Sequence, residues 1–332
     1  MHFHLEHQPA PLPRRIAHHH PMLLVGSCFT ENIGARLREL KFDIAENPHG
    51  ILFNPASIAD AVTDYCRGRV YGPGDIFSFN EGWHSWNHHS RFSDPSPDAC
   101  LDKINTSIAT AHSFLKRTRW LVITLGSAFV YGLRAENDRR LPGDRIVANC
   151  HKLPAASFNR RLLSPGELDP LLDHIRTEIR NVNPDAEIIY TISPVRHLRE
   201  GFVENNRSKA ALISAVHRQV DSHDNVHYFP AYELVIDDLR DYRFYAEDMV
   251  HPNYAATRYV WEKMMQSCMD EPTRDLIRTL QPLRSAYLHR PFNPGSAAHA
   301  RFLREHLQQL AELKARYPYI DFSEEERHFS AT

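Results

Sequence analysis

The residues of this chain that could do chemistry begin with Ser27. Residues 22–25 are all apolar and run directly into Gly26, Ser27 and Cys28, and a helical pattern follows at once. A serine at such a strand-to-helix turn can be a nucleophile, with the N–H groups of its own turn as oxyanion donors. The alternative is that Gly26 and Ser27 only turn the chain and cap the helix.

A candidate base and a carboxylate to orient it lie more than two hundred residues later. Asp248 and His251 are separated by two residues, and Pro252 follows at a position favoured in the first turn of a helix. A carboxylate in such a turn can hold one ring nitrogen of the histidine while the other nitrogen faces outward. Together with Ser27, these residues provide a nucleophile, a base and an orienting group.

These three side chains are far apart in the sequence, so the fold must bring their segments to the same edge of a sheet. Strands alternating with helices predict a doubly wound, three-layer α/β fold with a parallel sheet. Ligands bind such sheets at the carboxyl ends of the strands, where Ser27 falls. The apolar runs that predict buried strands are 22–25, 120–126 and 186–192, and shorter strands are expected at 42–45 and 226–229. The later helices are expected near 56–67, 99–117, 166–182, 206–222 and 253–268.

The rest of the sequence suggests three parts. Residues 1–21 are rich in Pro and His and are expected to form an irregular leader. Residues 22–270 contain the α/β pattern, and residues 271–332 contain no strand pattern and are expected to form a helical C-terminal extension. Within the α/β part, residues 68–97 and 132–163 have little periodicity and are expected to be loops.

Composition excludes several classes of function. The chain has 332 residues, 42% of them apolar and 24% charged, with a net charge of −2. These values are ordinary for a globular protein and do not favour nucleic acid or anionic membrane as a partner. No apolar run approaches the ~20 residues of a membrane span, and no signal peptide is visible. Five scattered cysteines without a CxxC pair predict neither disulfides nor a zinc site, so we expect a cytoplasmic protein without a cofactor.

Several short motifs resemble the GSCFA family. The signature block is Gly26-Ser27-Cys28-Phe29, with Thr30 where the family has alanine. That family is similar to the GDSL or SGNH hydrolases, so the resemblance implies a flavodoxin-like three-layer fold and ester hydrolysis or acyl transfer. The other motifs that carry it, over most of the chain, are Asn47-Pro48-His49-Gly50, Asn54-Pro55, His84-Ser85, the segment 88–92, the segment 149–152, the segment 193–197 and His251-Pro252-Asn253.

The resemblance assigns roles by motif. It makes Ser27 the nucleophile, with Asp248 and His251 as the Asp-x-x-His pair. Cys28 is the alternative nucleophile, because a helix N-terminus stabilises a thiolate. Ser27 is preferred, since it occupies the family's serine position and Cys28 would then point to the sheet core.

The expected oxyanion hole departs from the SGNH pattern. That pattern has Gly-x-Asn-Asp after the third strand, but Ala128 stands where its asparagine is expected. Loss of one oxyanion donor typically costs ~10²–10³ in rate. We therefore expect Ser27, Gly50 and Ser127 to supply the donors. The candidates to replace the missing asparagine are Asn54, Asn87, Ser127 and Arg196.

Further polar residues on this edge are candidates for substrate binding. Arg196, just past a strand end, could clamp an anion or a carbonyl, or could form a structural ion pair. His84 and His88 would share a helix face and could hold a metal, but the segment is not convincingly helical and no carboxylates complete a shell, so no metal is expected. The full set is Asn54, His84, Asn87, His88, His89, Arg91, Arg196 and His197.

Three classes of function remain open. The first is a serine esterase or acyltransferase acting on a small acyl ester, such as an acetyl ester, of a polar carrier such as a carbohydrate. The second is a non-catalytic binding protein on the same fold, suggested by the missing asparagine. The third is a metal-dependent phosphoesterase that uses the His-rich segment. The sequence does not fix the oligomeric state.

Overall fold

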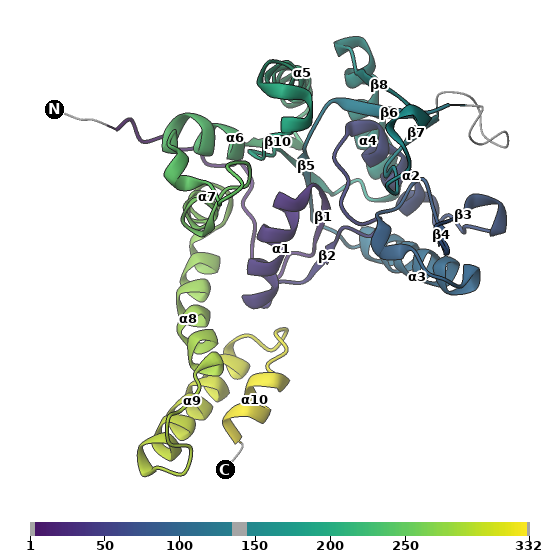
Figure 1. Cartoon of the computed structure of the whole chain (residues 1–332). Helices are drawn as coiled ribbons and strands as arrows, with labels where there is room; N and C mark the ends of the chain where they lie inside the picture. Colours follow the sequence, from purple (N-terminus) through teal and green to yellow (C-terminus); the bar gives the residue numbers. More distant parts are fainter. Residues whose placement is uncertain (1–3, 135–144, 331–332) are drawn as a thin grey trace.

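A five-stranded parallel sheet forms the centre of the protein (Figure 1). The computed structural model describes residues 4–134 and 145–330. The strand order is β10-β9-β5-β1-β2, and all neighbours pair in parallel. This is the order of flavodoxin-like doubly wound sheets, which confirms the predicted α/β fold. The strands are β1 (Met22–Gly26), β2 (Ile44–Glu46), β5 (Trp120–Leu125), β9 (Glu187–Ile192) and β10 (Val226–Phe229).

Helices cover both faces of the sheet, so β1 is buried on two sides. Met22 and Leu24 belong to the core on one face, and Leu23 and Val25 belong to the core on the other. Continuous burial explains why the strand is an unbroken apolar run. On the first face lie α1 (Cys28–Glu39), α6 (Ala231–Glu233), a π-helical turn (Leu234–Leu239) and α7 (Tyr254–Cys268). On the second lie α2 (Pro55–Arg67), α3 (Pro97–Leu115), α4 (Pro165–Val182) and α5 (Gly201–Ser222).

Two segments that were expected to be loops contain strands. The sequence does not reveal these short antiparallel strands because three to five residues show little periodicity. In β8 the central residues are exposed and polar, which removes the apolar signal altogether. Residues 135–144 of the second expected loop lie outside the described residues. The strands are the hairpin β3 (Phe77–Phe79) and β4 (Gly82–His84), and the sheet β6 (Phe129–Leu133), β7 (Arg145–Val147) and β8 (Phe158–Leu162).

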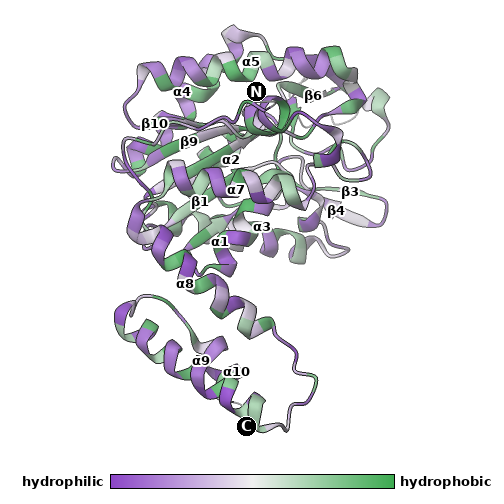
Figure 2. Cartoon of the chain, turned by 90° about the vertical axis from the view of Figure 1, so that its left-hand side faces the viewer, coloured by the Kyte–Doolittle hydropathy of each residue, from purple (hydrophilic) through white to green (hydrophobic). Residues whose placement is uncertain are grey.

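The C-terminal region is helical, as predicted, and forms an arm that extends from the sheet-bearing body (Figures 1 and 2). It consists of α8 (Glu271–Leu288), α9 (Ala297–Arg316) and α10 (Ser323–Ser330), of which α10 was not predicted. Apolar residues of the arm continue the core that lies under α7. The N-terminal segment packs on the same region, because Ile16 is fully buried and bridges Met269. Within the described residues, no helix is both long and apolar enough to cross a membrane.

The turn that carries Ser27 depends on the absence of a side chain at Gly26. Gly26 has φ +144°, and a Cβ added there would lie 2.3 Å from the carbonyl oxygen of Thr124. We expect Gly26→Ala to lower the free energy of unfolding by about 2–4 kcal/mol, because the neighbouring strand backbone cannot move aside. Urea unfolding measures this difference. In Gly166→Ala an added Cβ meets nothing within 4 Å, so this control should change stability by less than ~1 kcal/mol. Equal losses in the two variants would contradict the steric argument.

Candidate active site

Ser27 lies at the carboxyl end of β1, immediately before α1. Its backbone is extended, with φ −75° and ψ 177°, and its side chain makes no capping hydrogen bond to the helix. The residue is only 1% exposed, and its Oγ has no hydrogen-bond partner. A buried hydroxyl left unpaired costs about 1–3 kcal/mol. The structure therefore argues against helix capping as the reason for a serine at this position.

Asp248 and His251 form a preorganised pair. Asp248 Oδ2 lies 2.6 Å from His251 Nδ1, while Asp248 Oδ1 accepts the N–H groups of Val250 and His251 at 2.9 and 3.0 Å. These hydrogen bonds, led by the one from the His251 backbone, lower the pKa of Asp248 to about 2. The carboxylate is therefore ionised at neutral pH and holds Nδ1, which leaves Nε2 of His251 to act elsewhere.

The structure does not join this pair to Ser27 by a hydrogen bond. Both side chains of the pair are about half exposed, whereas Ser27 is buried. His197 follows β9 and lies at the end of β5: its Nε2 would be 3.4 Å from a Cβ added at Gly126, and its ring packs on Phe53 at 5.4 Å. Burial lowers the pKa of His197 to about 4, and the charges of Lys209 and His251 act in the same direction. His197 is thus a neutral ring at the ends of the central strands.

Lys209 is a residue of this region that the sequence analysis missed. It lies on α5, is 1% exposed, and its Nζ donates to the carbonyl oxygens of Gly126 and Ser193 at 2.6 and 2.7 Å. Those carbonyls end β5 and β9, so one ammonium joins two strands at the candidate site. Burial lowers the pKa of Lys209 to about 7, with a small opposing effect from Cys28. Its spacing from the apolar Leu212 and Val216 was a sequence signal for a buried lysine.

Cys28 does not have the properties of an activated thiol. Burial, supported by the charge of Glu31, raises its pKa, although the N–H groups of Phe29 and Cys28 act in the opposite direction. A raised pKa keeps the sulfur protonated at neutral pH, whereas a nucleophilic cysteine needs a thiolate. The structure thus gives no support to Cys28 as the alternative nucleophile.

The three expected oxyanion donors are all engaged by backbone carbonyls. The N–H group of Ser27 donates to Thr124 at 3.3 Å, that of Gly50 to Asn47 at 2.7 Å, and that of Ser127 to Phe53 at 3.0 Å. The loops after β2 and β5 use the N–H groups of Gly50 and Ser127 to close a turn and to dock on each other. The role of the three groups as oxyanion donors stays a prediction.

Most of the predicted substrate-binding side chains also serve the structure. Asn54 caps α2, accepting from the Ser57 N–H at 2.8 Å and donating to the Ser57 hydroxyl at 3.0 Å. His84 lies between the Ser93 hydroxyl and the Phe79 carbonyl, at 2.7 and 2.9 Å. These contacts engage both side chains within the protein, and their role in substrate binding stays a prediction.

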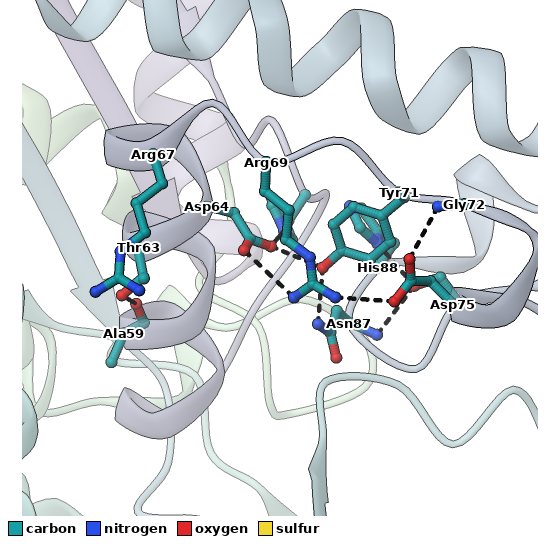
Figure 3. A network of polar contacts seen from close by, with 12 residues as sticks. Ala59, Thr63, Asp64, Arg67, Arg69, Tyr71, Gly72, Asp75, Asn87 and His88 are labelled. Carbon is teal, nitrogen blue, oxygen red and sulfur yellow. Dashed lines mark hydrogen bonds and ion pairs between the residues drawn. The ribbon is translucent and has the colours of Figure 1, made fainter. Parts of the chain in front are cut away.

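Asn87 and His88 belong to a buried network (Figure 3). Asp64 accepts from the Tyr71 hydroxyl at 2.7 Å and contacts His49 Nε2 at 3.1 Å, while Asn87 donates to the Tyr71 hydroxyl at 2.8 Å. Burial alone would raise the pKa of Asp64, but these hydrogen bonds outweigh it and lower the pKa. His88 stacks on His49 with ring centroids 4.0 Å apart, and burial holds its pKa well below the usual value.

This network fixes the loop after β2. The His89 N–H donates to the His49 carbonyl at 2.9 Å, and Arg91 donates to the carbonyl of Asn47. Asn87 donates to Tyr71 and His88 Nδ1 contacts the Ser85 hydroxyl, so the network supports residues 47–50, and the role of both side chains in substrate binding stays a prediction. The part of the chain that the structure describes contains no group of three or more His, Cys, Asp or Glu side chains that could hold a metal ion.

Fold and site together define an α/β protein with uncommitted polar side chains at the carboxyl edge of a parallel sheet. Residues 21–264 match the model of the GSCFA family, and residues 280–332 match that of the C-terminal domain of GSCFA domain proteins. The chain therefore belongs to the GSCFA family.

Two solved structures resemble the fold. One, from Streptococcus pneumonia, is assigned provisionally as a platelet activating factor; it shares 11% identity, with 76% of this chain and 84% of that chain covered and a TM-score of 0.39. The other is a family 3 carbohydrate esterase from Clostridium thermocellum, with 12% identity, 78% and 98% coverage and a TM-score of 0.34. A comparison with curated proteins gives no significant match.

The buried ammonium of Lys209 predicts a dependence of stability on pH. Its pKa of about 7 in the folded protein is lower than the ~10.4 of an unfolded lysine. Between these values the unfolded chain binds a proton that the folded chain does not, so this group makes stability rise with pH, by up to ~1.4 kcal/mol per unit. Urea unfolding from pH 7 to 10 should show this slope in the parent protein and lose it in Lys209→Met. The exposed Lys116→Met is the control, and parallel curves for all three proteins would contradict the prediction.

Proposed function

We propose that this protein is an SGNH-type serine ester hydrolase or acyltransferase that acts on a small acyl ester, such as an acetyl ester, of a polar small molecule or carbohydrate. Ser27 is the nucleophile, His251 the base and Asp248 the orienting group. The observation that carries the proposal is the 2.6 Å contact between Asp248 and His251 Nδ1, on the sheet edge where the Ser27 hydroxyl is uncommitted. We assign the activity to residues 22–270, with residues 271–332 as a helical extension.

The proposed reaction has two halves. His251 Nε2 takes the Ser27 proton as Oγ attacks the acyl carbonyl, and then gives that proton to the leaving alkoxide. Water or an acceptor hydroxyl next attacks the acyl-serine, and His251 removes its proton. Because Ser27 is buried and His251 is exposed, the segment 240–253 must close on Ser27 when substrate binds. Arg240 and Met249 have left-handed backbones within this segment and are suited to act as its hinges.

The surroundings of Arg196 favour a polar substrate. Its guanidinium lies 5.8 Å from the ring centroid of Phe202 and 5.6 Å from that of Tyr245. No carboxylate of the described residues lies within ion-pairing distance of it. A cavity of about 80 Å³ beside it is lined also by Arg240, Tyr242 and Tyr245. An aromatic-stacked guanidinium without an ion pair is suited to bind a carbonyl or an anionic group of a substrate.

A binding protein without catalysis is the second candidate. It is favoured by one observation, namely that the N–H groups of Ser27, Gly50 and Ser127 all donate to backbone carbonyls. The metal-dependent phosphoesterase has no comparable support among the described residues. The two remaining candidates differ in turnover, since a binding protein would retain ligand without cleaving it.

An acyl-ester panel with a fluorophosphonate probe tests the proposal. We expect the parent protein to hydrolyse or transfer at least one acyl group and to be labelled on Ser27 by mass spectrometry. Ser27→Ala and His251→Ala should each lose ~10³-fold or more in kcat, because nucleophile and base act as a unit. Asp248→Asn should lose less than His251→Ala, because the imidazole base survives.

Cys28→Ala is the matched control, since it removes the neighbouring nucleophile and should keep both labelling and activity. Labelling that moves to Cys28, or full activity in His251→Ala, would exclude the proposed mechanism. Tight binding of an ester without turnover or labelling would favour the binding protein instead.

A further inference from the structure

The side chain of Asn47 contains a buried donor without a partner. Asn47 directly follows β2 and is fully buried, and its N–H extends the ladder to the Leu24 carbonyl at 2.8 Å. Its Oδ1 accepts the N–H of Gly26 at 2.8 Å, whereas its Nδ2 has no hydrogen-bond partner. Because a backbone N–H can only donate, Oδ1 must face Gly26, so the orientation of the amide is set by chemistry.

Ser27 is the residue after Gly26, and its hydroxyl is the second uncommitted polar atom at this turn. An unpaired buried amide costs about 1–3 kcal/mol, and such groups in folded proteins call for a specific explanation. Here a free N–H donor and a free hydroxyl belong to residues held together at the end of β1. This is the combination that attack on a carbonyl requires, with one group to form the bond and one to receive the charge.

The other asparagine and serine candidates near this edge each have a hydrogen-bond partner within the protein. The amide of Asn54 donates to the Ser57 hydroxyl, and the amide of Asn87 donates to the Tyr71 hydroxyl. Ser127 Oγ contacts the Ser208 hydroxyl at 3.3 Å. Among Asn47, Asn54 and Asn87, Asn47 is thus the one whose Nδ2 has no hydrogen-bond partner. Ala128, at the position of the expected asparagine, has no side-chain donor.

The amide is also held rigidly. Asn47 has φ +44°, a left-handed conformation in which asparagine is one of the few favourable residues. Its carbonyl accepts from the N–H of Gly50 and from Arg91, and His49 Nε2 contacts Asp64, a residue of the network in Figure 3. A donor fixed before the reaction costs no reorganisation when charge develops.

We propose that Asn47 Nδ2 is the oxyanion donor of this site and replaces the asparagine that is absent at position 128. The assignment rests on the proposed function. When Ser27 Oγ bonds to the acyl carbon, the carbonyl π pair moves onto the carbonyl oxygen, and the Asn47 N–H binds the resulting oxyanion. When that pair returns, the bond to the alkoxide breaks, and the alkoxide takes the proton from His251.

Asn47→Asp separates the two functions of this side chain. The substituted side chain keeps an oxygen for the Gly26 N–H, but it removes the donor and adds a negative charge beside the oxyanion. We expect kcat to fall about 10²–10³-fold with KM changed less than threefold, because the lost interaction forms only in the transition state. Phosphonylation of Ser27, which develops the same charge, should slow by a similar factor.

Asn47→Gly is the second variant, because glycine tolerates φ +44° and removes the donor without adding charge. It should lose about 10²-fold in kcat. The matched control is Asn225→Asp, which changes a buried asparagine just before β10, at the opposite edge of the sheet. Circular dichroism and melting temperature establish that each protein is folded.

The outcomes separate the two proposals. If a folded Asn47→Asp or Asn47→Gly keeps kcat and the phosphonylation rate within threefold of Asn225→Asp, the assignment of Asn47 is overturned. If the parent protein has no esterase or transferase activity and Ser27 resists the probe, the proposed function fails, and the assignment of Asn47 fails with it. Loss confined to the Asn47 variants, with Ser27 labelled in the parent protein, supports both.

Discussion

The close approach of β1 to β5 is the constraint on which the candidate site depends. Gly26 lies opposite Thr124 in the parallel register, and the space between them admits no side chain. This contact lets the chain leave the sheet sharply, so that Ser27 begins α1 and its hydroxyl stays at the strand end. On the side of β1 that faces β2, the side-chain oxygen of Asn47 accepts the N–H of Gly26. Three neighbouring strands, β2, β1 and β5, are thereby joined through one glycine.

The sequence was sufficient for the main elements of the fold. Parallel strands buried on both faces must be continuously apolar, so β1, β5 and β9 were evident as short runs bounded by turn residues. The Asp248 and His251 contact followed from local spacing, because a single turn brings these residues together. The sequence did not predict β6, β7 and β8, whose pairing joins separate segments and, in β8, leaves the central residues polar and exposed.

Hydrogen-bond commitments could not be derived from the sequence. Gly50 and Ser127 were reasonable oxyanion donors by position, yet the Gly50 N–H closes a turn and the Ser127 N–H bonds the carbonyl of Phe53, contacts that exist only in the folded chain. Lys209 and Asn47 were missed for the converse reason, since a free or shared polar atom is defined by what surrounds it. The histidines show the same effect: His88 and His197 were considered as polar binding groups, and their burial, which the sequence does not show, lowers the pKa of both.

The burial of Ser27 has a consequence for the fate of an acylated enzyme. A serine that is 1% exposed gives bulk water almost no path to an acyl group attached to it. In the proposed mechanism, the lifetime of that intermediate is then set by opening of the surrounding loops, and by whichever nucleophile enters first. An acceptor hydroxyl that binds before the loops open has an advantage over water despite water's concentration. The depth of the serine, more than the chemistry of the triad, would therefore set the partition between transfer and hydrolysis.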